Sequence, residues 1–161
     1  MDKVNSQVFY LSTNVLRFDL LKRTLLCQSN DGNKNIWIKK IEVDVIHTII
    51  EDENNYYCSC GSDDKNGLFI AINRFNGDTN WYIPGRAFFH ILFKKYLFVI
   101  FIDEKEFYYL IKVQPEDGSK LWHYEVDKDL QEYSFKNDRI RLSYKSGKVE
   151  KISPITGAKI Y

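Results

Sequence analysis

The sequence is poor in the features that mark several common protein classes. Its 161 residues include three cysteines, three prolines and one methionine, and 23 Lys and Arg are balanced by 22 Asp and Glu. A net charge of +1 argues against a nucleic-acid-binding chain, because phosphate contacts require a clear excess of cationic side chains. An odd number of cysteines in a chain of this size argues against a disulfide framework and indicates reduced thiols.

No apolar run is long enough for a membrane helix or a secretory signal. The most apolar stretch, residues 88–102, is interrupted by a histidine and two lysines, and it is shorter than the ~18 residues that a membrane helix requires. Polar residues also break the apolar stretch that begins at Val8, whereas a signal peptide needs an uninterrupted apolar core. We therefore expect a cytoplasmic protein that has no membrane partner.

The apolar and aromatic residues are sufficient for a folded core. Hydrophobic residues make up 44% of the chain and aromatic residues 16%, which disfavours disorder, collagen and coiled coils. The length predicts one domain over residues 1–161. Helix signals are almost absent, and only residues 15–26 leave a helix open as an alternative to strands.

Four similar segments recur along the chain. They read LLCQSNDGNKNIW (25–37), FIAINRFNGDTNW (69–81), YLIKVQPEDGSKLW (109–122) and VEKISPITGAKIY (149–161). Their turn glycines, 45, 41 and 39 residues apart, are Gly32, Gly77, Gly118 and Gly157. Such a period is typical of repeat architectures in which each unit is one small sheet.

Local geometry explains the two positions that the four segments share, a glycine in the turn and an aromatic residue after it. Asn, Asp or Thr before Gly favours a hairpin turn, because glycine adopts a positive φ without a Cβ clash. An aromatic residue follows four or five positions later, at Trp37, Trp81, Trp122 and Tyr161. We expect these rings to lie at one equivalent place, between neighbouring sheets.

The segments that precede each hairpin predict two further strands per repeat. Four strands in about 40 residues match one blade of a β-propeller. The predicted fold is all-β, a small β-propeller-like domain of about four four-stranded antiparallel blades, with repeats over residues 8–41, 42–87, 88–130 and 131–161. Ring closure stays open at this stage, and an open, curved stack or an assembly completed by a partner are the alternatives.

The repeat resembles that of a known family. An apolar strand followed by a turn glycine and a Trp four residues later, as in INRFNGDTNW and VQPEDGSKLW, is similar to the repeats of quinoprotein-alcohol-dehydrogenase-like (PQQ-like) propellers. The motif concerns packing, so the resemblance implies the fold and not an activity. No residue matches the quinone or metal ligands of that family, and we expect no cofactor.

Few residues suggest chemistry. Cys58 and Cys60 share one strand face and lie near His47, but the spacing lacks a paired Cys-x-x-Cys, so we interpret them as core thiols and expect no metal. His90 and His123 lie beside aromatic residues and are interpreted as packing residues. Because common catalytic and nucleotide-binding motifs are missing, we expect a protein that is not an enzyme and has no catalytic residues.

The charge distribution points to a binding surface. Net charge alternates in blocks, with −7 over residues 41–64 and −4 over residues 103–130. In a meander, alternate loops emerge at the same end, which would gather acids from the second and third repeats. The predicted partner-binding residues are Asp63, Asp64, Asp103, Glu104, Glu106, Asp127 and Asp129. The alternative is a solvated set of loops that keeps the sheets soluble.

These features favour a non-enzymatic protein-binding module. The compact length and the Asn-, Lys- and Ile-rich composition are similar in style to bacterial toxin-immunity proteins, including those of contact-dependent inhibition systems. That resemblance implies a one-to-one complex with a cognate secreted toxin, in which acidic loops cover the basic groove of a nuclease. The alternatives are a propeller scaffold or assembly subunit, and a small-molecule-binding propeller. Nucleic acid is not expected, although the last repeat is locally basic.

Overall fold

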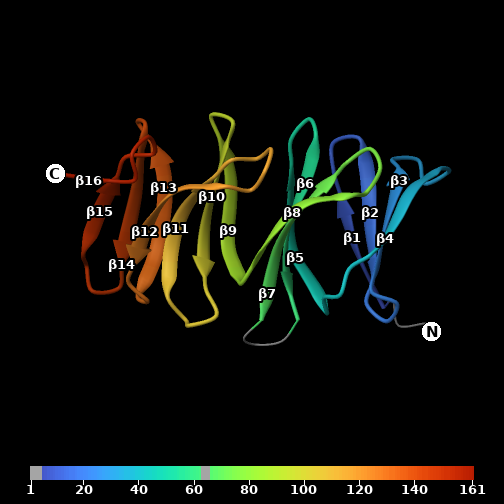
Figure 1. Ribbon diagram of the computed structural model, residues 1–161, viewed down its shortest axis with the longest axis horizontal. Helices are drawn as coiled ribbons and strands as arrows, with labels where there is room; N and C mark the ends of the chain where they lie inside the picture. Colours follow the sequence, from blue (N-terminus) through green and yellow to red (C-terminus); the bar gives the residue numbers. More distant parts are fainter. Residues whose placement is uncertain (1–4, 63–65) are drawn as a thin grey trace. The chain divides into compact units, whose positions relative to one another are not determined.

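The computed structural model describes residues 5–62 and 66–161, in which the regular elements are β-strands (Figure 1). Sixteen strands within these ranges form four antiparallel sheets of four strands, and each sheet pairs its strands in chain order. The described residues include no helix that is long and apolar enough to cross a membrane. The prediction of an all-β chain built from four four-stranded sheets is confirmed.

Internal contacts divide the chain into two compact units of two sheets each. The first unit comprises Met1–Ala87 with Glu116–Gly118, and the second comprises Phe88–Pro115 with Ser119–Tyr161. The division after Ala87 coincides with the predicted boundary between the second and third repeats. The assignment of all 161 residues to a single domain stays a prediction.

The first unit contains the sheets of the first two repeats. The sheets are β1 (Ser6–Tyr10), β2 (Asn14–Asp19), β3 (Thr24–Ser29) and β4 (Asn35–Lys40), and β5 (Val45–Glu51), β6 (Asn55–Gly61), β7 (Gly67–Asn73) and β8 (Thr79–Pro84). Residues 15–26 lie in β2, a turn and β3, so the alternative of a helix there is wrong.

The second unit contains the sheets of the last two repeats. The sheets are β9 (Arg86–Phe93), β10 (Tyr96–Ile102), β11 (Tyr108–Val113) and β12 (Lys120–Val126), and β13 (Leu130–Lys136), β14 (Arg139–Tyr144), β15 (Val149–Ile152) and β16 (Lys159–Ile160). The sequence predicts strands over residues 96–102, 120–126 and 139–144, and β10, β12 and β14 have these bounds.

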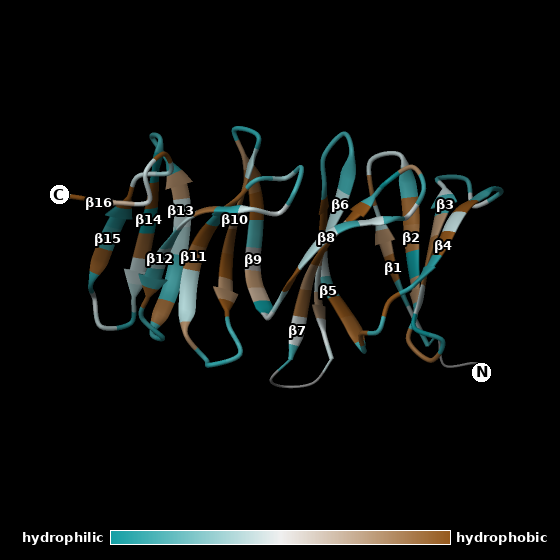
Figure 2. Ribbon diagram, viewed as in Figure 1, coloured by the Kyte–Doolittle hydropathy of each residue, from teal (hydrophilic) through white to brown (hydrophobic). Residues whose placement is uncertain are grey.

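Alternation of side chains along the strands builds each core. Leu16 and Phe18 on β2 pair with Cys27 and Leu25 on β3, and all four are buried on the face that packs against the second sheet. In the second unit Ile140, Leu142 and Ile152 pack in the same way against residues of β10 and β11. Figure 2 shows the contrast between the hydrophobic β10 and the hydrophilic turns. These strands follow a two-residue period, whereas β6 and β10 are buried on both faces.

The loop before the fourth strand is longer than a two-residue hairpin. In the second sheet, Gly77 N donates to Asn73 O at 2.9 Å, while Asn73 Oδ1 accepts the backbone N–H of Phe75 and Asn76. Gly157 N donates to Ser153 O in the same way at 2.8 Å. Both glycines adopt the positive φ that was predicted, 79° and 72°, and the side chain of Asn73 or Ser153 supports the turn.

A β-bulge precedes the Trp of each of the first three repeats. In the second sheet Ile72 pairs with Thr79 but Ala71 pairs with Trp81, so one extra residue is inserted before the Trp. The same register shift precedes Trp37 and Trp122. The extra residue changes which sheet face the ring lies on.

Each Trp lies against the turn glycine of the following repeat. A Cβ built on Gly77 would lie 2.7 Å from Trp37 Cδ2, and one on Gly157 would lie 2.5 Å from Trp122 Cδ2. Within the first unit Gly118 meets Trp81 in the same way at 2.6 Å. No side chain fits in these spaces, so the ring requires glycine independently of the backbone φ.

The two ends of the repeat series lack this contact. Gly32 has the same turn position and a φ of 73°, but no atom lies within 4 Å of a Cβ built there. At the other end β16 ends at Ile160, and Tyr161 follows the strand with its side chain fully exposed. The aromatic position of the fourth repeat therefore packs against no described turn.

The difference between Gly32 and Gly77 allows a matched test of the ring contact. Gly32→Ala should lower the free energy of unfolding by about 1 kcal/mol, the penalty of a left-handed non-glycine residue. Gly77→Ala should lower it by about 2 kcal/mol more, because the new methyl group overlaps the Trp37 indole. Urea unfolding measures both. Equal losses in the two variants would show that backbone conformation alone requires glycine.

Candidate functional site

The predicted acidic residues that the structure describes all lie in the second unit. Asp103, Glu104 and Glu106 are in the loop between β10 and β11, and Asp127 and Asp129 are in the loop between β12 and β13. Both loops emerge at the same end of their meander, because alternate turns of an antiparallel sheet share an end (Figure 1). The predicted residues Asp63 and Asp64 lie outside the described residues.

Asp103 shapes its own loop. Its Oδ1 accepts the backbone N–H groups of Lys105 and Phe107, each at 2.9 Å. The loop reverses at Glu106, which has a φ of 64°. Glu104 and Glu106 are exposed, and their carboxylates form no hydrogen bond or ion pair with described residues, so both are available to a partner.

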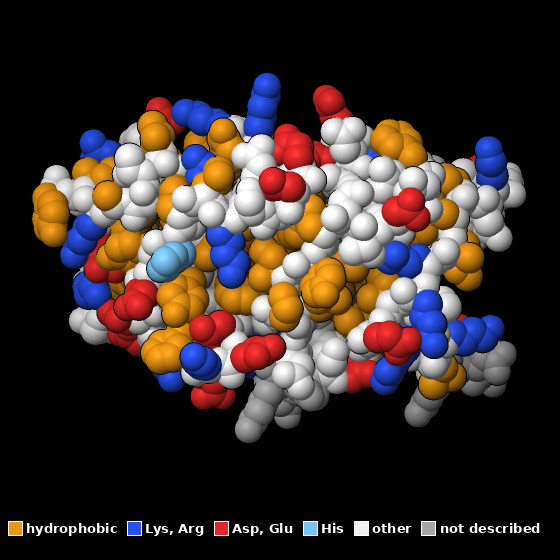
Figure 3. Space-filling model, in the orientation of Figure 1, with side chains coloured by type: hydrophobic (Ala, Val, Ile, Leu, Met, Phe, Trp, Pro, Cys, Tyr) orange, Lys and Arg blue, Asp and Glu red, His pale blue; other side chains and the backbone are white. Residues whose placement is uncertain are grey.

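The two acids of the other loop are engaged within the unit. Asp127 Oδ2 forms an ion pair with Lys148 Nζ at 2.6 Å, and Asp129 Oδ2 accepts the backbone N–H of Ser146 at 3.1 Å. Together they attach this loop to the turn between β14 and β15. The surface around them therefore carries charges of both signs, and Figure 3 shows acidic and basic side chains interspersed over the visible face.

Glu150 links the same turn to the core of the last sheet. Tyr144 Oη donates to Glu150 Oε2 at 2.6 Å, and Lys148 and Lys159 lie 3.2 and 3.3 Å from Oε1. Burial alone raises the pKa of the Glu150 carboxyl, but hydrogen bonds from Tyr144, Lys148, Tyr124 and Lys159 outweigh it and leave the pKa lowered. Glu150 is thus a buried, ionised and fully partnered carboxylate.

Exposed aromatic side chains accompany the free carboxylates of the β10–β11 loop. Phe107 follows Glu106 and is 54% exposed, and Phe88 is 53% exposed and stacks on Tyr108 with a 6.0 Å centroid distance. Phe88 and Tyr108 also line a hollow of about 280 Å³ with residues of the β12–β13 loop and β13. We call Phe88, Glu104, Glu106, Phe107 and Tyr108 the loop surface. The carboxylates of the loop surface were predicted from the sequence, and its aromatic residues were not.

A second hollow of about 260 Å³ lies on the other face of β11 and β12. Asp103, Tyr109, Lys120 and His123 line it with two apolar residues. The His123 and Tyr109 rings meet edge to face at 5.6 Å. Burial, followed by the charges of Asp103 and a neighbouring glutamate, raises the pKa of Tyr109. His123 is exposed, and its ring contact with Tyr109 is an aromatic one.

The cysteines and His90 are buried, whereas His47 is exposed. Cys58 and Cys60 are buried free thiols in the core between the first two sheets, and burial raises the pKa of Cys60 to about 12. His47 is exposed at a register shift of β5. His90 is buried, which lowers its pKa to about 4. Among the described residues, no three His, Cys, Asp or Glu side chains are grouped to hold a metal ion.

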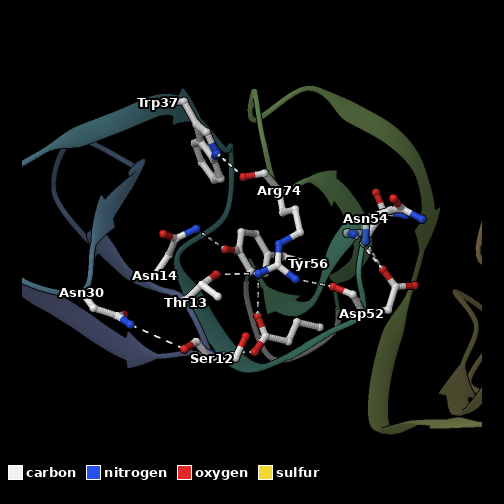
Figure 4. Close-up of polar contacts among 11 residues, drawn as sticks. Ser12, Thr13, Asn14, Asn30, Trp37, Asp52, Asn54, Tyr56 and Arg74 are labelled. Atoms are coloured by element: carbon white, nitrogen blue, oxygen red, sulfur yellow. Dashed lines mark hydrogen bonds and ion pairs between the residues drawn. The ribbon is translucent and has the colours of Figure 1, made fainter.

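A polar network that the sequence analysis missed joins the first two sheets (Figure 4). Arg74, whose side chain is 11% exposed, donates to Thr13 Oγ1 at 2.6 Å and to the Asp52 carbonyl at 2.5 Å, and it lies 3.7 Å from Glu51 Oε2. Its own carbonyl accepts the Trp37 indole N–H at 2.9 Å. Each of these partners lies within the unit, so the network is a structural joint.

Comparisons with known proteins find similarity in structure and not in sequence. No family model and no curated protein matches the sequence. BamB from Moraxella catarrhalis has a TM-score of 0.64 at 14% identity, over 96% of this chain and 50% of its own. The computationally designed protein Ika8 has a TM-score of 0.69 at 9% identity, and the match covers 96% of this chain and 47% of Ika8. The designed protein Ika4 has a TM-score of 0.65 at 9% identity, and the match covers 95% of this chain and 94% of Ika4.

The fold is propeller-like. The four-stranded meanders, the period of about 40 residues and these neighbours agree on that assignment. The chain spans about half the length of BamB and Ika8. Similarity at this level of identity describes the fold alone.

The Glu150 network predicts a pH-dependent stability. Because the folded pKa lies below the unfolded one, the stabilisation is complete above the unfolded pKa and is lost as pH falls through the folded value. Glu150→Gln should lower the free energy of unfolding by about 2 kcal/mol near neutral pH, and by less in acid. Urea unfolding at several pH values tests this, with the exposed Glu132→Gln on the same sheet as control. A loss that is the same at every pH would contradict it.

Proposed function

We propose that this protein is a non-enzymatic protein-binding module, and that its cognate partner is a secreted bacterial toxin that it neutralises as an immunity protein. The observation that carries the proposal is the loop surface, where Phe88 and Phe107 are half exposed beside the free carboxylates of Glu104 and Glu106. Stable protein interfaces combine aromatic anchors with a polar, charged rim. The propeller-like fold supports a scaffold that presents loops, but it does not indicate which partner binds.

The proposed mechanism is steric and electrostatic. Glu104 and Glu106 would face the cationic groove in which a nuclease holds phosphate groups, and Phe107 would enter a pocket beside it. Carboxylates in those positions occupy the sites of the substrate phosphates, so the toxin is blocked without any chemical step. Opposite charges on the two partners would also speed their association. Phe88 and Tyr108 would extend the contact along β9 and β11.

Co-expression with the product of the neighbouring gene tests the proposal. We expect growth arrest by that product alone, rescue by this protein, and a one-to-one complex in native mass spectrometry. Self-association without such a complex would favour an assembly subunit instead. A small molecule retained in the hollow beside Phe88 would favour a ligand-binding propeller.

Variants of the loop surface test which residues form the interface. The triple variant Glu104→Gln, Glu106→Gln and Phe107→Ala should weaken the complex about 100-fold, since loss of one aromatic anchor alone is worth about 2 kcal/mol. The matched control changes three exposed side chains of the first unit, Glu53→Gln, Asp78→Asn and Phe75→Ala, and should leave affinity within threefold. Titration calorimetry measures both. Equal weakening by the two triple variants would reject the loop surface as the interface.

A further inference from the structure

The outward face of the last sheet carries a cluster of cations. On this face Lys136 pairs with Arg139 across the β13–β14 hairpin, and Arg141 pairs with Lys151 between β14 and β15. The opposite face holds the buried core residues of the sheet, because side chains alternate along a strand. We call Lys136, Arg139, Arg141 and Lys151 the basic face.

Both cross-strand pairs of the basic face join like charges. Such pairs destabilise a sheet, whereas opposite charges at the same positions would stabilise it. None of the four cations forms an ion pair or a hydrogen bond with the described residues. The nearby Asp138 pairs with Lys94, and Glu150 is engaged on the other face of the sheet. Glu132 is the carboxylate that shares the outward face. The fold therefore leaves this positive charge uncompensated.

The cations surround a hollow that is lined by polar and charged residues, whose aliphatic stems also form part of its walls. Its volume is about 410 Å³, and its lining residues are Ser134, Lys136, Asn137, Arg139, Arg141 and Lys151. A protein partner would require apolar or aromatic anchors at the centre of the contact, and this hollow offers none. An extended polyanion requires cationic, hydroxyl and amide groups, and the residues that line this hollow supply all three.

The backbone holds the cluster in a defined arrangement. Asn137 and Asp138 both have positive φ, 52° and 55°, which is the geometry of a two-residue hairpin turn that matches the twist of the strands. Arg139 and Arg141 follow two residues apart on one strand face, about 7 Å from each other along β14. The charged groups are thus presented at a regular spacing on both sides of a two-residue hairpin turn.

We propose that the basic face binds a chain of phosphate groups. Two sources share this chemistry, the phosphodiester backbone of a nucleic acid and an inorganic oligophosphate. The net charge of +1 averages this face with the acidic loops and so conceals it. The proposal is independent of the toxin partner, because the loop surface and the basic face share no residue.

Binding of two probes to the full chain tests the proposal. We expect tripolyphosphate and a labelled single-stranded RNA oligonucleotide to bind, measured by calorimetry and fluorescence anisotropy at two salt concentrations. Tighter binding of the oligonucleotide identifies the phosphodiester source, and tighter binding of tripolyphosphate identifies the inorganic one. Polyglutamate of equal charge is the third probe. Binding of polyglutamate as tight as that of the phosphate probes would overturn the proposal in favour of an acidic protein partner.

A double variant locates the site. Arg139→Gln with Arg141→Gln should reduce affinity at least tenfold and lower the slope of log affinity against log salt by about 2. Its thermal stability should not fall, because each substitution removes a like-charge pair. The control Lys22→Gln with Lys34→Gln makes the same charge change on exposed turns of the first sheet. Absence of binding by the wild type, or equal losses in both double variants, would overturn the proposal.

Discussion

An indole ring held against a turn glycine is the contact on which this architecture depends. Each small sheet has two faces to cover and too few residues for a core of its own. Trp37 and Trp122 cover part of a face by packing against the turn of the following repeat, where a side chain on Gly77 or Gly157 would overlap the ring. The indole N–H then donates to a carbonyl of that same turn. At Trp37 and Trp122 the ring is therefore packed and its N–H is hydrogen-bonded at the same place.

This contact separates the residues that build the protein from those that are available to partners. The strands are used for packing, and the polar joint around Arg74 and the buried Glu150 stabilises neighbouring elements. The loop surface and the basic face are exposed and lie outside this packing. Their chemistry differs, since the loop surface combines aromatic residues with carboxylates and the basic face is cationic and polar. A scaffold of this kind can carry unrelated binding surfaces because its packing does not involve them.

Most of the fold follows from local patterns in the sequence. The spacing of Gly77, Gly118 and Gly157 predicts the repeat, and the strands predicted over residues 96–102, 120–126 and 139–144 match β10, β12 and β14. The two-residue pattern does not show the bulge before Trp81, because an inserted residue looks like any other until its partner strand is known. For the same reason the sequence did not predict the contact between the glycine and the indole ring. It explained the glycine by the turn and the ring by packing between sheets.

The surfaces were less accessible to sequence reasoning. Charge counting located Glu104 and Glu106 but could not show that Asp127 and Asp129 are engaged by the turn between β14 and β15. The like-charge pairs of the basic face depend on cross-strand register, which only the sheet reveals. Phe107 stands in an apolar segment and resembles a strand residue in sequence, although it lies in the loop.

Hydrogen exchange at the indole nitrogens tests the central contact most directly. Nε1–H of Trp37 donates to the Arg74 carbonyl at 2.9 Å, and that of Trp122 donates to the Pro154 carbonyl at 3.3 Å. If these rings join neighbouring sheets, both indole protons should exchange as slowly as the core amides of their units. NMR under native conditions measures both rates. Exchange of either proton at the rate of an exposed indole, while the core amides stay protected, would contradict the account.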